Sequence, residues 1–317
     1  MRVYASSADL SSAGDPPTTV VIGNFDGVHR GHQALLSHAR SLAELEGGRV
    51  LALTFDPHPT RFFAAALAPP LLTTRAQQLA LLSRHGVDAT VIEPFDATFA
   101  ALTPRAFAER LLVAALRARH VVVGADFVFG QRRAGTVPTL RALGDELGFL
   151  THGVEPERSD GAVISSTRVR ELVMQGALPA AARLLGRPYA LTGTIERGAG
   201  RGTTIGVPTA NLRPDNELLP APGVYAAIAI LPDQVQRGAV VNIGQAPTFA
   251  RGGTAIVEAH LLDFKGVLLG QPLELGFVER LRDEQRFPGA EALVATIHRD
   301  IDEARRRLAR STEPPPG

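Results

Sequence analysis

The sequence predicts a doubly wound α/β domain with a parallel sheet, followed by a small antiparallel β-barrel that ends in a helix. In the first half, apolar β-branched runs alternate with helical segments, which is typical of a parallel sheet covered on both faces. In the second half, short alternating strands are separated by glycine and proline, which is typical of a small barrel. The chain of 317 residues is long enough for two separate cores.

The composition is that of a soluble globular protein, with 45% hydrophobic and 21% charged residues. A formal net charge of +1 gives no reason to expect nucleic acid as a partner. No apolar run approaches the ~20 residues that span a bilayer, and the N-terminus lacks the apolar segment of a secretory signal. The absence of cysteine excludes disulfides and thiolate metal sites. We expect a cytoplasmic monomer or weak homo-oligomer that acts on small molecules, with no nucleic-acid or membrane partner.

The basic side chains are almost all arginine, because Lys265 is the only lysine. A Walker A loop requires a G-K-[ST] lysine, so this class of phosphate site is excluded. Phosphate chemistry in this chain must therefore use glycine loops, histidine, arginine, hydroxyls and a metal ion.

The stretch from Thr18 to His32, TTVVIGNFDGVHRGH, combines a buried strand, a glycine-containing loop and the start of a helix predicted over 32–46. Gly23 ends the strand, and the loop and helix start present free backbone N–H groups to an anion. His29 and His32 could donate hydrogen bonds to phosphate oxygens and stabilise charge that develops during displacement at phosphorus. The alternative is a pair of polar loop histidines.

Further strands are predicted over 49–55, 87–92 and 120–123, with helices over 75–85 and from the Thr103-Pro104 cap onward. Asp56 and His58 follow the strand 49–55, at the edge where side chains of such sheets face a site. The alternative for this pair is a rigid polar turn between prolines.

The strand 120–123 leads into GADFVFGQRRAG, a glycine-rich loop that contains Asp126 and Arg133. Its two aromatic residues, Phe127 and Phe129, are suited to holding a flat aromatic ligand. Ordinary packing under the loop is the alternative. Further on, ISSTR places Ser165, Ser166, Thr167 and Arg168 at a helix start, where hydroxyls and a guanidinium suit phosphate oxygens. A plain capped helix is the alternative for this segment.

In the second half, a hinge is expected at 186–188, after a stretch from 176 that leaves the α/β pattern. Alternation predicts strands over 189–195, 223–230, 238–243, 254–262 and 272–277. A helix with one apolar face is predicted over 290–310, and the tail 311–317 is predicted to be disordered.

The segment GTIERGAGRGTTIGVPTANL supplies a flexible glycine loop whose amides can cradle phosphates. Thr209 and Asn211 lie two residues apart and share a face if the segment is extended. Their neutral oxygens suit a magnesium ion that ATP phosphates already coordinate. A glycine-rich hairpin without a ligand is the alternative for the loop.

The first-half motifs GNFDGVHRGH, GADFVFG and ISSTR resemble those of the nucleotidyltransferase superfamily in the form found in bacterial FAD synthetases. The resemblance implies a domain over 1–183 in which His29 and His32 are catalytic. The implied ligand-binding residues are Gly23, Asn24, Phe25, Asp56, His58, Asp126, Phe127, Phe129, Arg133, Ser165, Ser166, Thr167 and Arg168.

The second half resembles riboflavin kinases in its glycine loop and PTAN motif, and in PGVY, VNIGQAPTF, VEAHLLDF and LRDEQRF. The resemblance implies a domain over 187–310, with Glu258 as the general base. Thr209 and Asn211 are the implied metal ligands. The implied ligand-binding residues are Gly198, Gly202, Thr204, Gly206, Pro208, Asn242, Arg282 and Glu284. Two departures are Thr203, where an arginine is usual, and Leu269, where a tyrosine is usual.

Together the motifs follow the order of the bifunctional riboflavin kinase/FAD synthetase family. The resemblance implies two reactions that use Mg²⁺ with ATP. The kinase phosphorylates riboflavin to FMN, and the adenylyltransferase converts FMN to FAD with release of pyrophosphate. One alternative is a nucleotidyltransferase for another phosphorylated acceptor. Another is an adenylyltransferase whose barrel is a non-catalytic flavin-sensing module.

Overall fold

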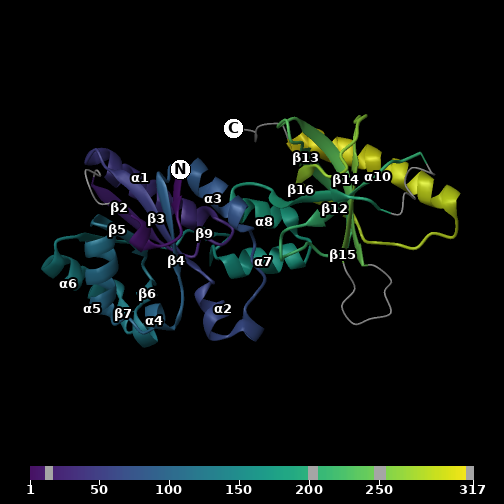
Figure 1. The fold of residues 1–317 in the computed structure, drawn as a ribbon. Coiled ribbons are helices and arrows are strands. Elements are labelled where there is room, and N and C mark those ends of the chain that lie inside the picture. The colour runs from purple at the N-terminus through teal and green to yellow at the C-terminus, as the bar shows by residue number, and fades with distance from the viewer. Residues whose placement is uncertain (11–16, 199–205, 246–254, 312–317) are drawn as a thin grey trace. The chain divides into compact units, whose positions relative to one another are not determined.

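The computed structural model describes residues 1–10, 17–198, 206–245 and 255–311 (Figure 1). The chain forms two compact units. The first comprises Met1–Pro70 and Arg75–Ser165, and the second comprises Leu71–Thr74 and the chain from Ser166 onward. The domain boundaries expected from the sequence, at 183 and 187, stay a prediction.

The first unit contains a six-stranded sheet in which every neighbouring pair is parallel, as the sequence predicts. The strand order is β1-β4-β3-β2-β5-β8, so the chain reverses its direction of winding at β2. The strands are β1 (Arg2–Tyr4), β2 (Thr18–Ile22), β3 (Arg49–Asp56), β4 (Ala89–Pro94), β5 (Ala118–Gly124) and β8 (Leu150–Val154).

Helices cover both faces of this sheet because successive strand residues point to opposite sides (Figure 1). Val21 packs with the helices α1 and α3, whereas Val20 packs with the segments α5 and α6 on the other face. The helices are α1 (Arg30–Leu45), α2 (Pro59–Phe63), α3 (Arg75–Arg84), α4 (Ala97–Ala100), α5 (Pro104–Phe107), continued by a π-helical stretch (Ala108–Ala115), and α6 (Val137–Leu147). Two small hairpins pair β6 (Val128–Phe129) with β7 (Gly135–Thr136) and β9 (Arg158–Ser159) with β10 (Ala162–Val163).

The second unit is a closed antiparallel barrel, which confirms the predicted class. Its strands follow one another around the barrel in the order β11-β12-β15-β14-β13-β16. Their bounds are β11 (Tyr189–Glu196), β12 (Ala210–Pro214), β13 (Gly223–Ile230), β14 (Gln236–Gln245), β15 (Ala255–Leu261) and β16 (Pro272–Arg282). Among the described residues, three helices accompany the barrel: α7 (Ser166–Met174), α8 (Leu178–Leu185) and α10 (Ala290–Ser311).

Two elements of the second unit were not predicted from the sequence. The stretch from 176 to 188 contains the helix α8, because Leu178, Leu184 and Leu185 are buried where the helix packs on β11 and β16. Gly186 ends this helix as its C-cap, with a left-handed φ of 71°, and the hinge expected at 186–188 stays a prediction. The strand β12, which carries part of the PTAN motif, was not among the predicted strands.

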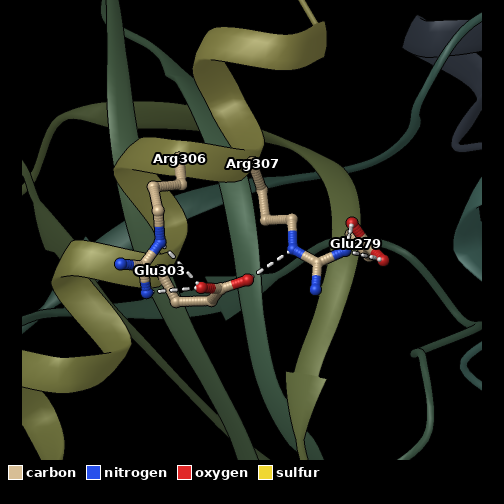
Figure 2. Close-up of polar contacts among 4 residues, drawn as sticks. All are labelled: Glu279, Glu303, Arg306 and Arg307. Carbon is tan, nitrogen blue, oxygen red and sulfur yellow. Dashed lines mark hydrogen bonds and ion pairs between the residues drawn. The ribbon is translucent and has the colours of Figure 1, made fainter.

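Helix α10 is fixed to the barrel by an apolar contact and by ion pairs. Ala304 is fully buried among Val224, Ala226 and Val240. Beside this contact, the Glu303 carboxylate accepts hydrogen bonds from Arg306 and Arg307 of the same helix, as Figure 2 shows. These pairs lie within the helix, so the apolar contact docks α10 on this part of the barrel.

The same arrangement ties α10 to β16. Arg307 also donates to Glu279 of β16, with N–O distances of 2.8 and 2.9 Å (Figure 2). Nearby, Arg282 at the end of β16 forms a bidentate pair with the buried Asp300 of α10. These pairs set the register of the helix along the strand.

Candidate active sites

The loop between β2 and α1 turns inward at Phe25, whose backbone has a φ of 50°. The Phe25 ring is fully buried and meets the His32 ring edge-on, with 5.4 Å between centroids. A side chain on Gly23 would lie 3.1 Å from the Phe25 ring, so glycine leaves the space into which that ring folds. This ring supports His32 from the protein side, and the contact of Phe25 with a ligand stays a prediction. Asn24 is exposed at the loop surface.

The two histidines of the HRGH segment lie together at the start of α1. His29 is the N-cap of the helix, and its Nδ1 accepts the His32 backbone N–H at 3.3 Å. The imidazole rings stack with 3.8 Å between centroids and 15° between planes. Because Nδ1 of His29 is an acceptor, the proton of the neutral ring lies on Nε2, which can donate to an anion. A side chain on Gly31 would lie 3.2 Å from the His29 ring.

His32 has the features of a neutral hydrogen-bond donor. Its buried Nδ1 has no hydrogen-bond partner among the described residues. Burial holds the pKa of His32 well below its usual value, and the neighbouring charge of His29 lowers that pKa further. The stacked pair therefore avoids carrying two positive charges at neutral pH. An unpartnered polar nitrogen beside a helix N-terminus is suited to an anionic ligand.

We expect His32 to remain uncharged at pH 6.5, where an unperturbed histidine is half protonated. Because its pKa is lower in the folded than in the unfolded state, the contribution of neutral His32 to stability is present above pH 6.5. That contribution is lost as the pH falls through the folded-state pKa. NMR of histidine Cε1–H signals during a pH titration measures the midpoint, and a midpoint at or above 6.5 would contradict the burial argument.

Asp56 and His58 lie where the sequence predicts them, at and just after the end of β3. Asp56 is exposed and forms an ion pair with Arg75 at 3.2 Å. His58 caps α2, and its Nδ1 accepts the Thr60 backbone N–H at 3.2 Å. The capping role engages Nδ1 of His58, and the contact of His58 with a ligand stays a prediction.

An aromatic ridge beside this edge was not recognised in the sequence. Phe63 and Phe62 of α2 are 69% and 38% exposed, and both rings contact Phe95. Ring contacts continue from Phe95 in the order Phe99, Phe107, Phe129 and Phe127. Exposed rings at the carboxyl edge of a parallel sheet are suited to a flat ligand.

Within this ridge, Phe129 belongs to the core. It is buried against Phe107, with 5.1 Å between ring centroids, and a side chain on Gly135 would lie 2.7 Å from it. This burial fits the packing alternative, and the contact of Phe129 with a ligand stays a prediction. Phe127 stacks on it at 5.5 Å and is partly exposed. Asp126 and Arg133 are exposed on the same loop.

The ISSTR segment spans the division between the units. Ser165 is the last residue of the first unit, and Ser166 begins α7 in the second. Thr167 is exposed in the first turn of this helix, and Arg168 follows it. The predicted helix start is therefore present, and its phosphate-binding role stays a prediction.

In the barrel, Asn211, Glu258 and Asn242 form one row across three neighbouring strands. Asn211 of β12 lies opposite Glu258 of β15, and Glu258 lies opposite Asn242 of β14. Residues directly opposite in an antiparallel sheet share a face, so the three polar side chains stand side by side. Their neighbours Val257 and Ile243 point to the opposite face and are buried.

Two cavities flank this row. One of about 360 Å³ is lined by Gly198, Pro208, Asn211, Phe264, Leu268 and Leu269, among others. The other, of about 450 Å³, is lined by Asn242, Arg282, Glu284, Phe287, Leu293 and Ile297, among others. Thr209 and Glu258 line both cavities. A carboxylate and a hydroxyl therefore stand where contents of the two cavities would meet.

Several barrel residues that the sequence predicts to bind ligands are held in place beside these cavities. The His260 ring bonds to the Pro208 carbonyl at 2.8 Å, which fixes the chain just before Thr209. Arg282 is held by Asp300, and its guanidinium lies 5.7 Å from the centre of the Phe287 ring. A side chain on Gly244 would lie 2.6 Å from the Glu284 carboxylate. Gly206 is exposed with a φ of 77°, and the predicted Gly202 and Thr204 lie outside the described residues.

The oxygens of Thr209 and Asn211 suit magnesium only when bound phosphates supply further ligands to the ion. No three histidine or acidic side chains converge as a metal site among the residues that the structure describes. Thr209 and Asn211 offer neutral oxygens on the smaller cavity. Neutral oxygens suit a hard cation whose charge is balanced by bound phosphates.

We expect Gly198→Ala to weaken the binding of magnesium–ATP in the barrel. An added Cβ would lie 2.0 Å from the Asn211 amide nitrogen, so Asn211 must leave its place on the cavity wall. The expected result is a rise of about tenfold in the KM for ATP in the barrel reaction, or about 1.4 kcal/mol. Steady-state kinetics measure it, with Gly289→Ala as the control, because open space surrounds Gly289. Equal KM values for the two variants would contradict this role.

The two units together define a two-site nucleotide-dependent transferase. The first has a parallel sheet with a histidine pair at the start of a helix, and the second has a barrel with two cavities that share a carboxylate. Comparisons with known proteins agree. The FAD synthetase family model matches residues 11–168, and the riboflavin kinase family model matches residues 185–308.

The chain is 39% identical to a bifunctional riboflavin kinase/FMN adenylyltransferase of Pseudomonas fluorescens, over 92% of this chain and 93% of the relative. It is 38% identical to the protein of the same description from Escherichia coli K12, over 95% and 96%. A solved structure described as a macrolide-efflux protein from Streptococcus pneumoniae has a TM-score of 0.86 and 29% identity, covering 96% of this chain and 98% of that one.

The chain belongs to the bifunctional riboflavin kinase/FMN adenylyltransferase family, with the FAD synthetase domain first and the riboflavin kinase domain second. It is an enzyme with both activities, and the alternative of a non-catalytic flavin sensor is not favoured. Among the described helices, none combines the length and the apolar character needed to cross a membrane.

Proposed function

We propose that the barrel phosphorylates riboflavin with Thr209 and Glu258 at the reacting centre. The observation that carries this proposal is that these two residues line both cavities. ATP occupies the smaller cavity, and the flavin ring occupies the larger one between Asn242, Phe287 and α10. Glu258 accepts the proton of the ribityl hydroxyl as that oxygen attacks the γ-phosphorus and ADP leaves.

Thr209 and Asn211 would hold magnesium together with the ATP phosphates. The ion, when bound, neutralises phosphate charge and orients the transferred group. The chain's own part is to present the two oxygens, and the bond between His260 and the Pro208 carbonyl keeps Thr209 in place. Asn211 can take its place because Gly198 has no side chain there, since an added Cβ would lie 2.0 Å from the Asn211 amide nitrogen.

For the first unit, we propose that His29 and His32 stabilise the α-phosphate of ATP during adenylyl transfer. A phosphate oxygen of FMN attacks the α-phosphorus, and the bond to the β-phosphate breaks to release pyrophosphate. The two imidazoles donate hydrogen bonds to oxygens on which charge develops. Asn24 positions phosphates, and the hydroxyls and guanidinium of Ser165–Arg168 hold them, as the sequence motif indicates.

The flavin of FMN is expected to use the aromatic ridge beside Asp56 and His58. Phe62 and Phe63 expose ring faces at this edge, and Phe127 exposes part of its ring at the other end of the ridge. Flat aromatic ligands stack on such surfaces. Asp126 and Arg133 lie in the loop that carries Phe127 and shape the same pocket.

The whole protein with riboflavin and magnesium–ATP tests the proposal in one reaction. We expect FMN to appear first and FAD second, with pyrophosphate released only in step with FAD. Chelating the metal with EDTA should stop both products. Liquid chromatography resolves FMN from FAD, and FMN that accumulates without FAD would contradict the proposal for the first unit.

We further propose that the enzyme works in the cytoplasm as a monomer or weak homo-oligomer, with ATP, riboflavin and FMN as its small-molecule partners. A chain without cysteine fits a reducing compartment. Light scattering across a range of protein concentrations determines the assembly state.

A further inference from the structure

Gln78 on α3 is a nearly buried amide to which neither reaction assigns a role. It is 6% exposed, and both ends of its side chain are engaged. Its Nε2 donates to the Asn24 carbonyl at 2.7 Å, and its Oε1 accepts from Arg75 at 2.5 Å. A buried polar side chain that meets a carbonyl and a guanidinium at once can be replaced by few other residues.

The contacts of Gln78 join the two loops that follow β2 and β3. Arg75 continues from Gln78 to the Asp56 carboxylate at 3.2 Å and to the Phe55 carbonyl at 3.4 Å. On the other side, the Asn24 carbonyl also accepts from the buried Thr54 hydroxyl at 3.4 Å. The two loops are thus connected through the side chains of Gln78, Arg75 and Thr54, in which each donor meets an acceptor.

The Asn24 carbonyl directly precedes the inward turn at Phe25. Phe25 has a left-handed backbone and is fully buried, and its ring lies edge-on to His32. If the peptide between Asn24 and Phe25 rotates, the Phe25 ring loses its position and His32 loses its support. The hydrogen bond from Gln78 therefore acts on the histidine pair through two neighbouring residues.

We propose that Gln78 is a positioning residue of the adenylyl-transfer site. It holds the Asn24 carbonyl so that the loop 23–29 presents His29 and His32 to the α-phosphate, and with Arg75 it aligns Asp56 beside the same loop. This inference rests on the proposed role of the histidine pair. It requires a donor at Gln78 Nε2, because the group opposite is a carbonyl oxygen.

Gln78→Glu separates positioning from folding because it keeps the size of the side chain and its bond to Arg75 but removes the donor. An acceptor then faces the Asn24 carbonyl at about the distance of the lost hydrogen bond. We expect kcat for FMN adenylylation to fall at least tenfold, with the KM for FMN within about twofold. Riboflavin phosphorylation by the same full-length protein should be unchanged, which provides an internal measure of intact enzyme.

A control variant completes the test. Ala80→Glu places the same negative charge on an exposed position of α3 and should leave both reactions unchanged. The NMR titration of His32 adds a second readout, since loosening of its support should raise its midpoint in Gln78→Glu but not in Ala80→Glu.

Wild-type kcat and an unchanged His32 midpoint in Gln78→Glu would overturn the inference. These outcomes differ from failure of the proposed function. That failure would appear as FAD formation by a protein that lacks the His32 imidazole, whatever residue stands at position 78.

Discussion

Replacing His32 by alanine is expected to abolish FAD formation while FMN formation continues. The imidazole lies at the helix mouth with a buried nitrogen that lacks a partner among the described residues, and its stacking on His29 orders both rings. Loss of one preorganised donor typically slows a reaction by about 10²–10³-fold, and here the stacking of His29 is lost as well. The measurement is the rate of FAD formation from supplied FMN, beside the rate of riboflavin phosphorylation.

The matched control for this substitution is His38→Ala. His38 lies on the same helix, but it is exposed and its ring neighbours His152. We expect this variant to keep both activities. If His32→Ala forms FAD at a rate near that of wild type, the histidine pair is not the catalytic centre of the first unit.

Glu258→Gln is expected to have the opposite effect. The amide keeps the shape of the side chain in its row between Asn211 and Asn242, but it cannot accept the proton of the attacking hydroxyl. A positioned general base contributes about 10²–10⁴-fold, so riboflavin phosphorylation should fall by that factor. FAD formation should be normal when FMN is supplied directly.

Glu274→Gln makes the same chemical change elsewhere in the barrel. Glu274 lies on β16 and is not among the residues that line either cavity. Kinetics of the two variants, measured side by side, separate the loss of a base from the loss of a barrel charge. Equal rates in both variants would remove Glu258 from the proposed mechanism.

The local parts of this architecture could be predicted from the sequence. The β-branched run of β2, the glycine after it and the apolar stripe of α1 are signals within a few residues, and the structure confirms both elements. The helix begins two residues earlier than predicted because His29 provides the cap, which the expectation of a start at His32 overlooked. In the barrel, the predicted strand 223–230 coincides with β13.

What could not be predicted depends on contacts between distant residues. The row of Asn211, Glu258 and Asn242 is a matter of strand register, which periodicity alone does not determine. The burial of Phe25 and Phe129 likewise follows from the space that Gly23 and Gly135 leave, whereas aromatic residues in a glycine-rich loop suggest exposure.

The position of Thr209 and Glu258 on the walls of both cavities also has a pharmacological consequence. The proposed placement of ATP and flavin predicts that a bisubstrate inhibitor would bind in both cavities at once. Such a molecule joins a purine nucleoside to a tricyclic ring by a chain the length of a triphosphate, which would run past Thr209 and Glu258. Since joining two weak fragments makes the second association intramolecular, such a molecule gains over either half by about 10²–10⁴ when its linker fits. The linker length that gives the tightest binding would measure the separation between the bound phosphate donor and the bound flavin acceptor.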